Sequence, residues 1–227
     1  MIEKKHKTLA IIPARKNSKR FPGKNHKTLG SIPLFMHSIN YAKNNSEFID
    51  EIIISTDDPV IFDTAENENV RLIKRPDNLG KDTTSTLEVL VHVLEDIGEK
   101  YDNVILLQPT NPLRPLDLLK HCWQLYTQKN LDSLFTVSST FKKFGKIKND
   151  NFEPFNYKFG HRSQDLEPLY YENGLLYIAK AEMIRNGKLM DGNSFPYIVD
   201  HPFAEVDIDE QVDFDYAEFL LNRSENK

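Results

Sequence analysis

The chain has 227 residues, of which 39% are hydrophobic and 28% are charged, and its formal net charge is −5. This length fits one domain, and the acidic balance argues against general binding to nucleic acid or to anionic membranes. The single cysteine, Cys122, excludes intrachain disulfides and zinc clusters and suits the reducing cytosol. No apolar run approaches the ~18 residues of a membrane span, and the N-terminal residues lack the apolar part of a signal peptide. We therefore expect a soluble, cytoplasmic protein.

Strands alternate with helices along most of the predicted chain. Short apolar runs predict strands at Thr8–Pro13, Glu51–Thr56, Val70–Lys74, Val104–Leu107, Ser133–Val137 and Leu175–Ala179. Helical spacing and cap residues predict helices over residues 32–39, after Asp58–Pro59, and at Thr84–Glu99, Leu116–Gln128 and Phe214–Leu221. This alternation is typical of an α/β domain with a doubly wound, mostly parallel sheet.

The alternation stops between residues 139 and 173. This segment is rich in Phe, Tyr, Lys, Asn and Pro and has no sustained periodicity. Loops of such length inside compact domains are usually functional or bind a partner. We therefore predict a single domain over residues 1–227 with an inserted arm at about residues 139–173.

Polar side chains gather where the predicted strands end, which is where open α/β sheets bind their ligands. The first strand leads into a loop with five cations, namely Arg15, Lys16, Lys19, Arg20 and Lys24. The other polar segments at this edge are Ser55–Asp57, Arg75–Pro76, Gln108–Thr110 and Asp207–Asp209. The basic loop contains neither GxxxxGK[ST] nor GxGxxG, which excludes a Walker ATPase and a dinucleotide-binding enzyme. Either an anion binds there, as it can between a strand and a helix N-terminus, or the loop is simply solvated.

Two acids near the C-terminus have the spacing of a metal site. Asp207 and Asp209 are separated by one residue, so on a strand both carboxylates would point to one face. Mg²⁺ commonly takes one or two carboxylates and completes its coordination with phosphate oxygens and water. The alternative is an exposed acidic edge or a helix cap, because Glu210 and Asp213 follow. Ser85 could likewise contact a ligand or cap a helix, since Glu88 three residues later completes the pattern of a capping box.

Five segments in this order resemble the nucleotidyltransferases that activate nonulosonic acids with CTP, the acylneuraminate cytidylyltransferase family. They are IIPARKNSKRFPGKN, RPDNLGKDTTST, VILLQPTNPLR, YENGLLYI and VDIDEQVD, and they extend over nearly the whole chain. The Kdo-activating enzymes share the first loop but differ where this chain has ILLQPTNP, so they rank second. Lys16-Asn17 replaces a frequent Gly-Gly, and Tyr171-Glu172 replaces a frequent Arg-Pro. The second difference leaves the identity of the sugar open.

The resemblance implies a Rossmann-like nucleotidyltransferase that uses CTP and a nine-carbon 2-keto acid sugar. It implies catalytic roles for Arg15, Lys24 and Asp209, and an Mg²⁺ or Mn²⁺ site at Asp207 and Asp209. The implied nucleotide contacts are Ala14, Arg15, Asn25, Arg75, Ser85 and Thr86. The implied sugar contacts are Gln108, Thr110, Arg162, Asn173 and Tyr177.

The resemblance also implies a homodimer in which the arm of one subunit reaches the sugar site of the other. Other sugar nucleotidyltransferases remain an alternative, as does a non-catalytic nucleotide-binding protein on the same fold. A non-catalytic protein would be marked by loss of the metal acids or of the loop cations, and this chain has both.

Overall fold

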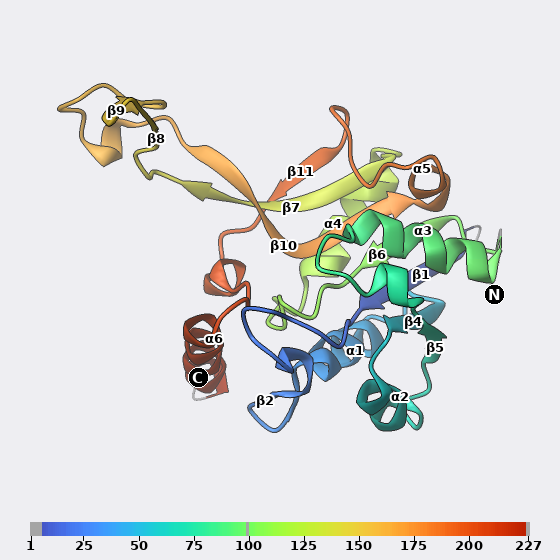
Figure 1. The fold of residues 1–227 in the computed structure, drawn as a ribbon. Coiled ribbons are helices and arrows are strands. Elements are labelled where there is room, and N and C mark those ends of the chain that lie inside the picture. Colours follow the sequence, from blue (N-terminus) through green and yellow to red (C-terminus); the bar gives the residue numbers. More distant parts are fainter. Residues whose placement is uncertain (1–5, 99, 226–227) are drawn as a thin grey trace.

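A computed structural model describes residues 6–98 and 100–225 (Figure 1). Its centre is a seven-stranded sheet of order β11-β7-β10-β6-β1-β4-β5. The strands are β1 (Thr8–Pro13), β4 (Glu51–Thr56), β5 (Arg71–Lys74), β6 (Asn103–Leu106), β7 (Ser133–Thr140), β10 (Leu169–Lys180) and β11 (Phe195–Ile198). The helices are α1 (Leu34–Asn44), α2 (Pro59–Ala65), α3 (Thr86–Ile97), α4 (Leu118–Gln128), α5 (Ala181–Arg185) and α6 (Gln211–Glu225). Every predicted strand and helix is therefore present.

The sheet is mostly parallel, as the alternation predicted. β1 pairs in parallel with β4 and β6, and β11 pairs in parallel with β7. β10 is antiparallel to both of its neighbours, β6 and β7. The reason is that the chain leaves the sheet at the end of β7 and returns beside it, and a direct return makes an antiparallel pair. Two further two-stranded sheets pair β2 (Thr28–Leu29) with β3 (Ile32–Pro33) and β8 (Gly145–Lys148) with β9 (Asn151–Pro154).

The sheet is buried on both faces. Successive residues of β1 enter opposite cores, because side chains on a strand alternate between its faces. Ala10 and Ile12 join the cluster under α1 and α4, whereas Leu9 and Ile11 join the cluster under α3 and α5. Burial on both sides explains why this strand reads as a continuous apolar run. The core thus fixes the carboxyl ends of the strands, from which the polar loops emerge.

The predicted helix caps are present at both positions. Asp58 Oδ1 accepts a hydrogen bond from the Val60 N–H at 3.0 Å, at the start of α2. Ser85 and Glu88 form a reciprocal capping box at the start of α3. The end of this helix was predicted at Glu99, which lies outside the described residues.

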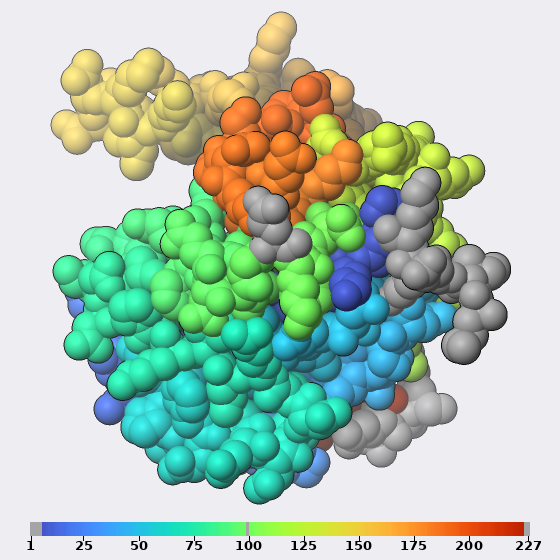
Figure 2. All heavy atoms as spheres, turned by 90° about the vertical axis from the view of Figure 1, so that its right-hand side faces the viewer, coloured from blue at the N-terminus to red at the C-terminus, as the bar shows by residue number. Residues whose placement is uncertain are grey.

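The segment between β7 and β10 forms an arm that projects from the body, in yellow at the upper left of Figure 1. β7 and β10 continue as a pair into its base, where Ser139 lies opposite Tyr170. The view in Figure 2 shows the arm standing clear of the body as well. β8 and β9 lie in the arm, and the sequence pattern gave no sign of them. The residues of β8 are all exposed, so no alternation between buried and exposed positions marks the strand.

No helix within residues 6–98 and 100–225 combines the length and the apolar character that a membrane span requires.

Candidate active site

A cavity of about 310 Å³ lies at the carboxyl edge of the parallel strands. Its walls come from the loops after β1, β5 and β6, from the start of α3 and from the segment before α6. The predicted residues that line it are Arg15, Lys24, Asn25, Arg75, Ser85, Thr86, Gln108, Thr110, Asp207 and Asp209. The fold therefore gathers into one cavity residues that are almost 200 positions apart in the sequence, because parallel strands end at the same edge of the sheet.

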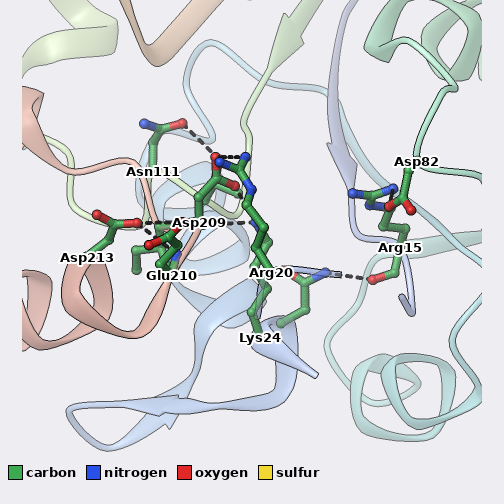
Figure 3. Close-up of polar contacts among 11 residues, drawn as sticks. Arg15, Arg20, Lys24, Asp82, Asn111, Asp209, Glu210 and Asp213 are labelled. Carbon is green, nitrogen blue, oxygen red and sulfur yellow. Dashed lines mark hydrogen bonds and ion pairs between the residues drawn. The ribbon is translucent and has the colours of Figure 1, made fainter. Parts of the chain in front are cut away.

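The cations of the basic loop face acids from other segments (Figure 3). Arg15 pairs with Asp82 at 2.7 Å. On the other side of the view, Lys24 pairs with Asp209 at 3.1 Å, and Arg20 pairs with the same carboxylate. Four cations of this loop thus share two carboxylates, Asp82 and Asp209, so the loop keeps an excess of positive charge. That excess favours a loop that holds an anionic group.

Lys24 is only 8% exposed and fastens the basic loop to the acidic segment. Its ammonium donates hydrogen bonds to the Ile208 carbonyl at 2.9 Å and to Asp209 Oδ1 at 3.1 Å. A buried cation must be paired in this way, because leaving it alone in a low-dielectric site is costly. The chain reaches this position through Gly23, whose φ of +66° is unfavourable for other residues.

Asn25 presents a free acceptor at the cavity. Its Nδ2 donates to the Arg15 carbonyl at 2.8 Å, which ties the two ends of the loop together. Its Oδ1 is buried and accepts no hydrogen bond from the described residues. Buried polar atoms are nearly always paired, so this oxygen is an exception among the residues that line the cavity.

Arg75 contributes a fixed cation at the end of β5. The guanidinium is buried and donates to the Ser55 carbonyl at 2.9 Å. Burial lowers the pKa of Arg75 to about 10, and the nearby carboxylate of Asp57 opposes that change. Arg75 therefore keeps its positive charge at neutral pH.

Asp207 and Asp209 line the cavity, although the segment that carries them forms no strand. Residues 206–208 are extended without a ladder partner, and one hydrogen bond at 2.8 Å joins the Ile208 N–H to the Thr110 carbonyl. Val206 and Ile208 are buried and alternate with the two acids, so the predicted common face is correct. Partial burial and the charge of Asp209 both raise the pKa of Asp207.

The sequence left a helix cap open as the alternative role for this acidic segment, and Asp213 has that role. Asp213 Oδ2 accepts hydrogen bonds from the backbone N–H groups of Asp209 and Glu210, at 2.9 and 2.8 Å. Asp213 therefore satisfies backbone donors at the start of α6. Ser85 likewise serves its cap, because its hydroxyl accepts a hydrogen bond from the Glu88 N–H at 3.2 Å, while the residue also lines the cavity.

Four predicted contacts do not line the cavity. Arg162 lies in the arm, where it is exposed and pairs with Asp165 at 2.7 Å. Asn173 and Tyr177 are buried in β10. Ala14 is buried too, and its N–H donates to the Ser55 carbonyl at 3.0 Å. Within one chain, these four residues are therefore not part of the cavity lining.

The sequence did not reveal the contacts of two residues that matter here, Asn111 and Asp82. Asn111 is 1% exposed, and its amide donates to the carbonyls of Asn173 and Val206, at 2.9 and 2.8 Å. It thereby joins the loop after β6 to β10 and to the acidic segment. At Gly174, which has a φ of +76°, a Cβ atom would come within 2.6 Å of the Asn111 side chain. The adjoining prolines marked this loop as rigid, but no sequence signal identified its partners.

Asp207 and Asp209 supply only part of the ligand set that a hard divalent cation requires. Two carboxylates line the same cavity, and oxygen donors are what Mg²⁺ and Mn²⁺ prefer. Within the described part of the chain, however, no group of three or more His, Cys, Asp or Glu side chains could hold a metal. Such a cation would therefore need further ligands from a bound molecule.

The sequence of the chain is similar to those of known cytidylyltransferases. Residues 9–226 match the sequence profile of the cytidylyltransferase family. The chain is 30% identical over 226 residues to the CMP-N,N'-diacetyllegionaminic acid synthase of Legionella pneumophila, covering 94% of this chain and 95% of that protein. It is 28% identical over 234 residues to the N-acylneuraminate cytidylyltransferase of Streptococcus agalactiae serotype III, covering 97% of this chain but only 56% of that protein.

The fold is similar to that of solved nucleotidyltransferases. A structure of CMP:2-keto-3-deoxy-manno-octonic acid synthetase complexed with CTP superimposes with a TM-score of 0.70 and 16% identity, over 96% of this chain and 99% of the other. At this identity the likeness shows the fold alone, and it confirms the predicted α/β architecture. Since the family profile extends over nearly the whole chain, the protein belongs to the cytidylyltransferase family.

Proposed function

We propose that the protein transfers CMP from CTP to a nonulosonic acid and releases pyrophosphate. The observation that carries this proposal is the convergence of Arg15, Lys24 and Arg75 with Asp207 and Asp209 in one cavity. The three cations suit the triphosphate, and the two acids suit a metal ion at the end of the nucleotide that reacts. The names of the two relatives support the same class of reaction.

In the proposed reaction the anomeric hydroxyl of the sugar attacks the α-phosphorus of CTP. A bond forms between that oxygen and phosphorus, the bond to the β-phosphate oxygen breaks, and pyrophosphate leaves with the electron pair. Such transfers depend on positioning and charge neutralisation rather than on covalent catalysis. Arg15 and Lys24 would stabilise the charge that develops on the leaving group, which is effective where the cations are held in place beforehand. Asp209 is our candidate to accept the proton of the hydroxyl.

Asp207 and Asp209 would hold Mg²⁺, or Mn²⁺ in its place. When bound, the cation would neutralise charge on the triphosphate. Because the chain supplies a pair of carboxylates rather than a larger cage, the nucleotide would have to provide the other ligands. Asn25 would orient the nucleotide through its unpaired Oδ1.

We propose that the sugar binds next to Gln108 and Thr110, at the end of the cavity beyond β6. The two relatives are named for different sugars of one class, so the proposal is limited to that class. Lys81 also lines the cavity, and it is a second candidate, besides Arg162, for the carboxylate of the sugar.

We also propose a homodimer in which the arm contacts a second copy. Phe155 and Phe159 are 68% and 73% exposed on an arm that stands clear of its own body (Figure 2). Exposed aromatic groups of this kind mark interaction surfaces. In a dimer, Arg162 could reach the cavity of the partner, which would reconcile its exposed position with the role that the resemblance implies.

The free thiol of Cys122 suits a cytoplasmic location.

The test is pyrophosphate release from CTP with a panel of nonulosonic acids and Kdo, with and without Mg²⁺. We expect Mg²⁺-dependent release with one acid, and loss of release in Arg15→Ala and Asp209→Ala, while circular dichroism shows that both variants are folded. A wild-type protein that neither releases pyrophosphate nor binds CTP would overturn the proposal.

A further inference from the structure

Asp82 lines the cavity and bridges two cations of the basic loop. It lies in the loop between the short 3-10 helix Asp77–Leu79 and α3. One oxygen pairs with Arg15 Nη1 at 2.7 Å, and the other pairs with Lys19 Nζ at 3.0 Å. A single carboxylate thus occupies two cations at once, as one phosphate group would. Figure 3 shows the Arg15 guanidinium turned toward this acid.

These ion pairs are open to solvent. The side chains of Arg15 and Asp82 are each 31% exposed, and Lys19 is 85% exposed. The hydrogen bond from Lys19 and the charge of Arg15 lower the pKa of Asp82, so its carboxylate is charged at neutral pH. Ion pairs at such exposed positions contribute little free energy, so a multivalent anion can replace Asp82 as their partner.

The basic loop is anchored without Asp82. The Lys16 N–H donates to Asp57 Oδ1 at 2.7 Å, and Asn25 donates to the Arg15 carbonyl at 2.8 Å. At the far end of the loop, buried Lys24 donates to the Ile208 carbonyl at 2.9 Å. The shape of the loop therefore has three other supports, and Asp82 mainly neutralises side-chain charge.

We propose that Asp82 is a resident counter-ion, which pairs with Arg15 and Lys19 until phosphate groups displace it and which pairs with them again as pyrophosphate leaves. This inference rests on the proposed function, because it takes the triphosphate of CTP as the displacing anion. Asp82 is then a positioning residue that limits phosphate affinity and assists product release. A purely structural role predicts the opposite sign: removing a supporting acid would weaken anion binding, whereas removing a competing acid strengthens it.

The experiment is calorimetric titration of inorganic pyrophosphate into the full chain, in buffer with a metal chelator. Asp82→Asn should bind pyrophosphate about fivefold more tightly than wild type, which is the order expected when competing part-exposed ion pairs are removed. Asp82→Glu keeps the negative charge and should bind more weakly than Asp82→Asn. Asp77→Asn is the matched control: Asp77 lies in the same region, makes no ion pair within the described residues, and should leave the affinity unchanged.

Affinity equal to or weaker than wild type in Asp82→Asn would overturn the counter-ion role. The binding comparison does not require turnover, so it can be read separately from the proposed function. If the wild type forms CMP-sugar but Asp82→Asn does not bind pyrophosphate more tightly, only the role of Asp82 fails. If no acid of the panel is activated, the proposed reaction fails, and a tighter affinity in Asp82→Asn would still support Asp82 as a competitor for phosphate.

Discussion

The cavity and the arm are built in opposite ways. Side chains of the cavity come from distant segments, and buried hydrogen bonds hold these segments together, such as those of Lys24 and of Asn111 beside the cavity. The arm is held mainly by contacts within itself, including the β8–β9 pair and the Phe152–Phe159 ring contact at 6.5 Å. Its aromatic side chains remain largely exposed. One chain therefore builds the cavity by itself, whereas the aromatic side chains of the arm stay exposed within that chain.

This difference implies that nucleotide binding and assembly can be changed separately. Substitutions in the cavity should abolish turnover or destabilise the body, and substitutions in the arm should alter association while CTP still binds.

Asp209→Asn should lower kcat/KM by about 100-fold or more, because a fixed charge at a reacting centre is commonly worth that much. The substitution is nearly isosteric, so the shape of the side chain is kept while the charge is lost, and only one of Lys24 and Arg20 keeps an oxygen partner. Pyrophosphate release measures the effect. Asp215→Asn on α6, where Asp215 accepts a hydrogen bond from Gln211, is the matched control and should retain activity. Full activity in Asp209→Asn would remove Asp209 from the mechanism.

Asn111→Ala should lower the free energy of unfolding by about 2–4 kcal/mol, because two buried carbonyls lose their donor. Urea denaturation measures this change. The control in the arm is Asn151→Ala, which removes an exposed hydrogen bond to Asn149 and should cost less than about 0.5 kcal/mol. Equal costs in the two variants would contradict the contrast between a tightly bonded cavity and an open arm.

The double substitution Phe155→Ser and Phe159→Ser should shift a dimer toward monomer at micromolar concentration, because it removes exposed aromatic area from the arm. Analytical ultracentrifugation gives the association state, and CTP titration should give the wild-type affinity. Val212→Ser, at an exposed apolar position on α6, is the control for a general loss of surface hydrophobicity. A wild-type protein that is monomeric would contradict the proposed use of the arm.

Cys122 should not react with a thiol reagent in the native protein. The side chain is fully buried, and burial raises the pKa of its thiol to about 12, so almost no thiolate is present at mildly alkaline pH. After denaturation the reagent should label one thiol per chain, as the sequence requires. Rapid labelling of native protein would show that the core of the body opens more readily than the fold implies.

The sequence predicted the features that depend on local pattern. Apolar runs buried on both faces identified the parallel strands, and cap residues such as Asp58 and Ser85 marked the helix starts. The period-two spacing placed Asp207 and Asp209 correctly on one side, although no strand forms there. Such spacing requires only an extended backbone with alternating burial, and a ladder partner is not needed.

The features that the sequence did not reveal depend on contacts between distant segments. The antiparallel direction of β10 follows from the path of the arm, and no property of its own residues indicates it. The pairing of Arg15 with Asp82 joins residues 67 positions apart, and the charge pattern alone offered several partners. The bracing role of Asn111 was not predicted for the same reason, because it depends on the two carbonyls to which Asn111 donates.

The most direct test of the central claim is calorimetric titration of CTP into wild type and into Arg15→Gln, with the other nucleoside triphosphates for comparison. If the cavity holds the triphosphate, the wild type should bind CTP in preference to the other nucleotides, and Arg15→Gln should bind it at least about tenfold more weakly, a loss of ~1.4 kcal/mol. Equal CTP affinity in wild type and in a folded Arg15→Gln variant would place the nucleotide elsewhere and contradict the account.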